Sequence, residues 1–139
     1  MTVTLSDEAR QAIAVFEDVT GATATDCVFD DERVVFVVAP DDMGAAIGEG
    51  GETVGQVEAA LGRPVRLVED AERPAAFVAN ALAPAAVYNV TISENDDRVA
   101  YAEVDHADRG VAIGEDGHNI AMARRLAARH FDIDDVQLA

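Results

Sequence analysis

The sequence contains no lysine, no tryptophan and only one cysteine, Cys27. All ten of its basic residues are arginines. A Walker-A phosphate loop, a Schiff-base lysine and a lysine-rich nucleic-acid arm are therefore excluded. A single cysteine cannot form an intrachain disulfide or a cysteine-based zinc site. Because aromatic residues make up only 5% of the 139 residues, the core must be mainly aliphatic.

Long hydrophobic runs and targeting signals are also missing. The first ten residues, MTVTLSDEAR, have neither a basic region nor an apolar region, so no signal peptide is expected. The least polar stretch, residues 75–88, is interrupted by Asn80 and Pro84 and is too short to span a bilayer. We therefore expect a cytoplasmic protein that has no membrane partner.

Positive charge is scarce. The chain carries 27 acidic and 10 basic residues, a formal net charge of −17, and the acids are spread along its whole length. Carboxylates keep a surface hydrated in concentrated salt, where the Debye length falls to about 3 Å and their mutual repulsion is screened. This composition indicates a protein from a halophilic organism.

The chain contains one internal repeat. Residues 42–51 and 108–117 are identical at seven of ten positions, with an offset of 66 residues. A repeat of about half the chain length indicates two copies of one module rather than a solenoid. We expect two domains, residues 1–71 and 72–139.

Each copy shows the same order of expected elements. In the first copy, helical spacing predicts a helix that starts after Ser6 and ends at Gly21. Strands near 24–29 and 34–39, two short helices around the glycines, and a strand over 64–69 follow. In the second copy Pro74 suits a helix start, and the alternation of Tyr88, Val90 and Ile92 predicts a half-buried strand. The order α-β-β-α-α-β twice predicts an α+β protein of two modules, each with a three-stranded sheet packed by helices.

The repeated segment has the form Ile-Gly-x-x-Gly between two short helices. Glycines permit a sharp turn and a close approach of a ligand to the backbone, and a helix N-terminus favours phosphate. A dinucleotide-binding fingerprint does not fit, because the glycine spacing is wrong and Asp116 replaces the middle glycine in the second copy. A KH module, whose G-x-x-G loop clamps a run of nucleotides, fits both copies.

These tandem loops resemble KH domains of the prokaryotic, type II topology. Asn80 with Pro84-Ala85, the run from Gly117 to Ile120 after the second loop, and Arg129-His130 resemble the archaeal NusA-like transcription factors. The resemblance covers nearly the whole chain. It implies binding of single-stranded RNA linked to transcription elongation or termination. RNA polymerase is a second candidate partner.

The candidate RNA-binding residues lie in and after the two loops. They are Ile47, Gly48, Glu49, Gly50, Gly51, Ile113, Gly114, Glu115, Asp116, Gly117, His118, Asn119, Arg125 and Arg129. The loops carry acids where KH loops usually carry a basic residue, which weakens phosphate binding. Residues 1–70 have a net charge of −11 and residues 71–139 of −6, so we expect the second loop to bind RNA better. His118, Arg125 and Arg129 share one helix face, which we expect to follow the bound strand.

Other readings remain open. A ribosome-associated KH protein and a protein-interaction module that has lost strong RNA binding are alternatives, and the acidic loops favour the second. No nucleophile, base and orienting group occur together, so no enzyme and no small-molecule substrate are expected. The histidines fall at twelve-residue intervals without further ligand spacing, so neither a metal nor another cofactor is expected.

Overall fold

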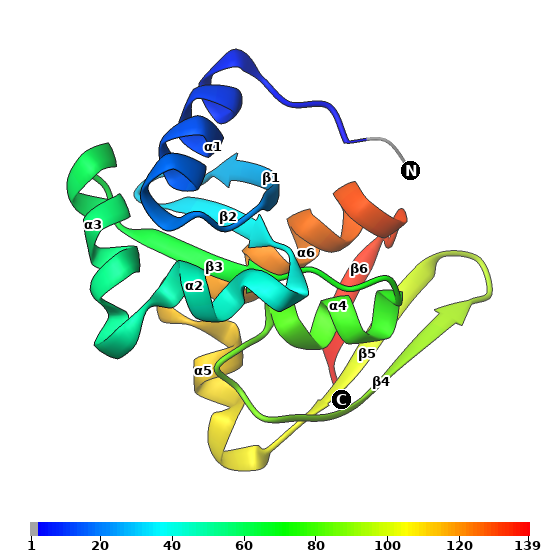
Figure 1. The fold of residues 1–139 in the computed structure, drawn as a ribbon. Coiled ribbons are helices and arrows are strands. Elements are labelled where there is room, and N and C mark those ends of the chain that lie inside the picture. Colours follow the sequence, from blue (N-terminus) through cyan, green and yellow to red (C-terminus); the bar gives the residue numbers. More distant parts are fainter. Residues whose placement is uncertain (1–2) are drawn as a thin grey trace. The chain divides into compact units, whose positions relative to one another are not determined.

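The computed structural model describes residues 3–139, which divide into two compact units, Thr4–Asp70 and Ala71–Ala139. Both have the element order α-β-β-α-α-β and one three-stranded sheet, as Figure 1 shows. The predicted fold class is therefore confirmed. Among the described residues, no helix is long and apolar enough to cross a membrane.

The N-terminal unit contains three helices, α1 (Asp7–Thr20), α2 (Met43–Ile47) and α3 (Glu52–Leu61), and three strands, β1 (Ala24–Phe29), β2 (Val34–Val38) and β3 (Val65–Glu69). Strand β2 is central, antiparallel to β1 and parallel to β3. Ser6 begins α1 by accepting a hydrogen bond from the Ala9 N–H, and Gly21 ends it in the left-handed conformation. Phe16 on α1 stacks on Phe36 of β2 at 4.4 Å between ring centroids, which fixes the helix on the sheet.

The C-terminal unit repeats this plan with helices α4 (Pro74–Ala81), α5 (Arg109–Ile113) and α6 (His118–Phe131) and strands β4 (Val87–Glu94), β5 (Arg98–Val104) and β6 (Asp135–Leu138). Strand β5 is central, antiparallel to β4 and parallel to β6. Phe77 of α4 is fully buried and packs against the rings of His130 and Phe131 near the end of α6. Among the described residues, β6 pairs only with β5 and so forms one edge of the sheet.

The sequence prediction is wrong for one residue of β4. Val90 and Ile92 are half-buried, but Tyr88 is 70% exposed. The pairing of β4 with β5 shifts its register between Val87 and Asn89. An irregularity of this kind breaks the two-residue alternation on which the prediction relied.

Candidate nucleic-acid interface

Each glycine loop begins at a position that only glycine can occupy. Gly48 and Gly114 have φ of 74° and 80° with ψ of 171° and 170°, a region that is essentially restricted to glycine. A Cβ atom on Gly48 would lie 2.2 Å from Oγ1 of Thr53, and one on Gly114 would lie 2.7 Å from Cβ of Asn119. These glycines therefore let each loop lie directly against the helix that follows it.

The rest of the loop forms a tight turn that leads into the next helix. The Gly117 N–H donates to the Gly114 carbonyl at 3.1 Å, and the Gly51 N–H donates to the Gly48 carbonyl at 3.2 Å. In the C-terminal loop, Asp116 has φ of 55°, the left-handed conformation that Gly50 adopts in the N-terminal loop. The hydrogen bonds that close the turns do not use the amides of the two middle residues.

Asn119 holds the C-terminal loop in place. Its side chain is buried, and its Nδ2 donates to the carbonyls of Val111, at 3.2 Å, and Leu82, at 3.4 Å. The sequence predicted that Asn119 contacts RNA. In the structure its amide donates to two carbonyls inside the unit, because burial requires that its polar atoms find partners there, and the RNA contact stays a prediction.

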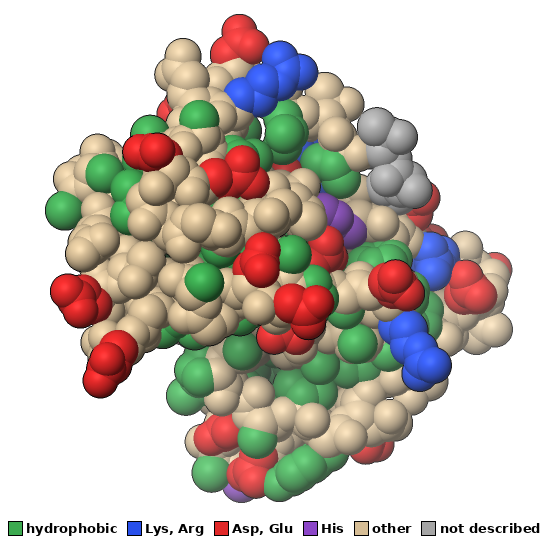
Figure 2. Space-filling view, viewed as in Figure 1, with side chains coloured by type: hydrophobic (Ala, Val, Ile, Leu, Met, Phe, Trp, Pro, Cys, Tyr) green, Lys and Arg blue, Asp and Glu red, His purple; other side chains and the backbone are tan. Residues whose placement is uncertain are grey.

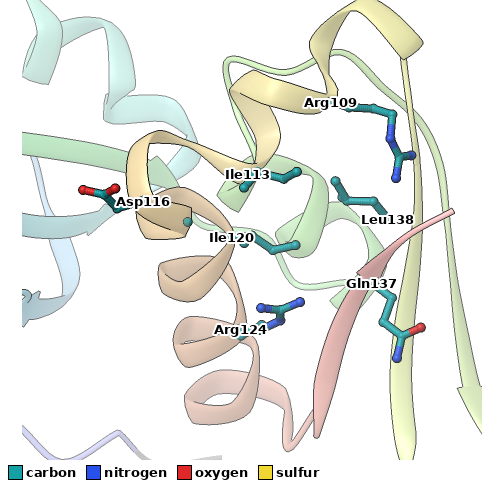
Figure 3. Close-up of a pocket in the computed structure, with 8 residues that line it drawn as sticks. Arg109, Ile113, Asp116, Ile120, Arg124, Gln137 and Leu138 are labelled. Carbon is teal, nitrogen blue, oxygen red and sulfur yellow. The ribbon is translucent and has the colours of Figure 1, made fainter.

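A groove of about 570 Å³ lies next to this loop in the C-terminal unit (Figure 3). Helix α5, the loop, α6 and the edge strand β6 all contribute to it. Its lining consists of Arg109, Ile113, Asp116, Gly117, Ile120, Arg124, Gln137 and Leu138. Figure 3 shows the three aliphatic side chains facing one space between the helices and β6, whereas the Asp116 carboxylate points away from it. The groove thus offers apolar surface for bases, with the loop carboxylate directed elsewhere.

Two arginines flank the groove, one held by β6 and the other by Ala139, the residue that follows it. The Arg109 guanidinium donates to the Ala139 carbonyl at 3.1 Å. Nε of Arg124 lies 3.1 Å from the Val136 carbonyl and 2.9 Å from Oδ1 of Asp135. Partial burial raises the pKa of Asp135, but hydrogen bonds from Gln137, from the Val136 amide and from Arg124 outweigh it and lower that pKa overall. Each arginine is fixed at one end and retains further N–H donors for a phosphate or a base.

The corresponding positions of the N-terminal unit have no positive charge. The 66-residue offset places Met43 where Arg109 stands and Glu58 where Arg124 stands. Oε2 of Glu58 accepts a hydrogen bond of 2.8 Å from the Val65 N–H. Strand pairing makes Val65 the counterpart of Val136, because their β2 and β5 partners, Val34 and Ala100, are also 66 residues apart. Val65 and Val136 occupy the same position in the two units, and side chains of opposite charge, Glu58 and Arg124, hold them.

The structure brings together only part of the predicted site. Ile47 and Ile113 are each 41% exposed beside their loops, and Glu49, Glu115, Asp116 and His118 are exposed. Within the described part of the chain, the lining of the groove includes neither Arg125, which is exposed, nor Arg129, which is half-buried. The lining of the groove also includes residues that the sequence prediction did not name as site residues, namely Arg109, Ile120, Arg124, Gln137 and Leu138. Ile120 and Arg124 lie four residues apart on one face of α6, and this spacing is visible in the sequence.

Figure 2 shows carboxylate side chains scattered over the visible face, with few arginines among them. This distribution agrees with the even spread of acids along the sequence. Against this background, the two arginines of the groove are a local departure from an acidic surface.

Two loop-bearing modules of this topology define a tandem KH-domain protein. A model of the NusA-like second KH domain matches residues 74–139, and a KH-domain model matches residues 10–72. The chain belongs to the NusA-like family, whose members are transcription factors and not enzymes. KH domains imply RNA binding.

Relatives match over nearly the whole chain. "Probable transcription termination protein NusA" of Halobacterium salinarum is 69% identical over 138 residues, 99% of each chain. The protein of the same name from Halococcus morrhuae is 64% identical over 139 residues, 100% of each chain. The structure described as "Crystal structure of APE1850" has a TM-score of 0.85 and 28% identity, and the match covers 97% of this chain and 100% of that one. The haloarchaeal relatives agree with the salt adaptation that the composition indicates.

Proposed function

We propose that this chain binds single-stranded RNA in the groove of its C-terminal unit and acts through it in transcription elongation and termination. One observation carries the proposal: a Gly-x-x-Gly turn opens onto an aliphatic groove that is flanked by Arg109 and Arg124. Unpaired bases need apolar surface, and phosphates need N–H donors. The names of the relatives support the link to transcription termination.

The N-terminal unit is the weaker RNA site in this proposal. Its loop is conformationally equivalent, but Met43 and Glu58 replace the two arginines. A carboxylate beside a phosphate is repulsive, by about 1 kcal/mol at 4 Å in water, and molar salt reduces this cost. The N-terminal loop, residues 47–51, therefore contributes through its backbone amides alone, whereas the C-terminal loop, residues 113–117, acts together with a cationic groove.

A titration of the full chain with RNA in molar KCl tests the proposal. Single-stranded RNA is expected to bind more tightly than a duplex of the same sequence, because a paired base cannot enter the groove. The variant Ile120→Glu, which places a carboxylate on the groove wall, is expected to abolish most of this binding. Equal binding of single-stranded and duplex RNA, or full binding by Ile120→Glu, would contradict the proposal.

The acidic loops favour a second function, contact with a protein of the transcription machinery. Capture of RNA polymerase by the chain after ribonuclease treatment tests this role. Retention by both the wild type and Ile120→Glu would support a protein contact that is independent of the RNA groove. Loss of capture after ribonuclease treatment would show that RNA bridges the two proteins.

A further inference from the structure

The C-terminal sheet has a neutral polar strip on the face away from its core. In β5, Ala100, Ala102 and Val104 are buried, whereas Tyr101 is 38% exposed. Strand pairing sets Thr91 of β4 on one side of Tyr101 and Gln137 of β6 on the other. Both neighbours are also exposed. Thr91, Tyr101 and Gln137 thus cross the sheet in one row, here called the outer row.

The outer row reaches the groove at Gln137. This residue lies on the edge strand and lines the groove, and it is also the register partner of Tyr101. Its Nε2 donates to Oδ2 of Asp135 at 3.1 Å, and Nε of Arg124 lies 2.9 Å from the other oxygen, Oδ1, of that carboxylate. The Asp135 carboxylate beside Gln137 is thereby paired with a cation, which reduces its repulsion of a polyanion.

Tyr101 has a ring that is available to a ligand. Among residues 3–139, no ring packs against Tyr101 and no hydrogen bond holds its hydroxyl. The other tyrosine, Tyr88, is more exposed but is tied through its hydroxyl to the Asp105 carboxylate. Both tyrosines of this aromatic-poor chain lie on the C-terminal sheet, but only Tyr101 is adjacent to a residue of the groove.

The geometry points to a stacking subsite for RNA on Tyr101. A strand bound in the groove passes over the edge of β6 at Gln137, and its next base stacks on the Tyr101 ring, with Thr91 and Gln137 as hydrogen-bonding neighbours. Base stacking on an aromatic side chain tolerates any base because every base has a π face. The subsite rests on the proposed RNA-binding function of the groove and lengthens the bound segment beyond the four nucleotides that one KH groove clamps.

RNA of two lengths distinguishes binding at the subsite from binding in the groove. A randomised pool of RNA tetranucleotides fills one groove, and a pool of twice that length also reaches the outer row. In the full chain in molar KCl, Tyr101→Ala is expected to weaken binding of the longer pool about tenfold and to leave the tetranucleotides unaffected. Tyr101→Phe, which keeps the ring, is expected to bind both pools as the wild type does. Tyr88→Ala is the matched control, because it removes an exposed tyrosine outside the row.

Tyrosine fluorescence gives an independent measure, because the chain has no tryptophan and two tyrosines. In the variant Tyr88→Phe, Tyr101 is the only tyrosine left. The longer pool is expected to quench its emission through stacking, and the tetranucleotides are not. The subsite alone would be overturned if the ratio of the affinities for the longer pool and the tetranucleotides were the same in wild type and Tyr101→Ala. It would also be overturned if Tyr88→Ala lost more affinity for the longer pool than Tyr101→Ala does. A wild-type chain that binds neither pool would overturn the proposed function and the subsite together.

Discussion

Replacement of Arg124 by Gln is the sharpest test of the groove. The side chain of Arg124 is 45% exposed and is held on β6 by the Val136 carbonyl and Asp135. Glutamine keeps an N–H donor for the Val136 carbonyl but removes the charge. A charge about 4 Å from a phosphate contributes about 1 kcal/mol in water, and this exposure is closer to water than to an interior, so we expect a roughly fivefold loss of affinity for single-stranded RNA.

The salt dependence of binding makes this prediction more specific. Loss of one phosphate contact to a single strand lowers the slope of log K against log salt by about 0.7. Titrations of wild type and Arg124→Gln over a range of KCl concentrations measure this slope. We expect the two affinities to converge in molar KCl, where the Debye length is about 3 Å.

Two further arginine variants serve as comparisons. Arg10→Gln makes the same change in net charge on α1 of the N-terminal unit, where Arg10 pairs with Asp7. This variant is expected to leave RNA binding unchanged. Arg125→Gln tests the helix face that the sequence predicted. If Arg125→Gln lost as much affinity as Arg124→Gln, or if the salt slope of Arg124→Gln equalled that of wild type, the assignment of the groove would be refuted.

Four further predictions follow from the loops and strand ends. Gly114→Ala is expected to lose about 1–3 kcal/mol of unfolding free energy, because of its backbone conformation and its contact with Asn119; Gly110→Ala, which has open space in α5, is expected to lose none, and denaturant unfolding of both variants measures this. Asp116→Gly is expected to stabilise the chain by up to about 1 kcal/mol, because glycine adopts a φ of 55° freely, and to raise RNA affinity by removing a carboxylate; unchanged or lower affinity would contradict this. Glu58→Gln keeps an acceptor for the Val65 N–H but removes the negative charge, so RNA affinity is expected to rise, most clearly in an Arg124→Gln background. The hydrogen bond from Tyr88 lowers the pKa of Asp105. Wild type is therefore expected to have a higher unfolding free energy than Tyr88→Phe at neutral pH, and this difference is expected to vanish as the pH falls through the lowered pKa. A difference that persists in acid would exclude this cause.

The repeat made most of the fold predictable. Ser6 and Gly21 mark the ends of α1, and the offset between the two loops fixes one module as a copy of the other. Tyr88 was misplaced because an irregular strand pairing depends on the partner strand, which a single-strand pattern does not describe.

The site was less predictable than the fold. The spacing of α6 defines several faces but does not say which of them meets β6, since that depends on the parallel pairing of β5 with a strand more than thirty residues later in the chain. The arginine next to the predicted Arg125 was therefore the one found in the groove. The internal hydrogen bonds of Asn119 were unpredictable for a similar reason: a polar residue after a loop is either exposed or satisfied internally, and only the packing of Leu82 and Val111 decides between these.

The contacts at Val65 and Val136 show how a duplicated module can change its sign without changing its shape. In the N-terminal unit the Glu58 carboxylate on the preceding helix accepts a hydrogen bond from the last strand. In the C-terminal unit the Arg124 guanidinium donates a hydrogen bond to the last strand. The backbone of each residue carries both an N–H donor and a C=O acceptor, so a side chain of either charge can hold this position of the strand. The charge at this position can therefore change in either unit, by evolution or by design, while the fold of that unit is kept.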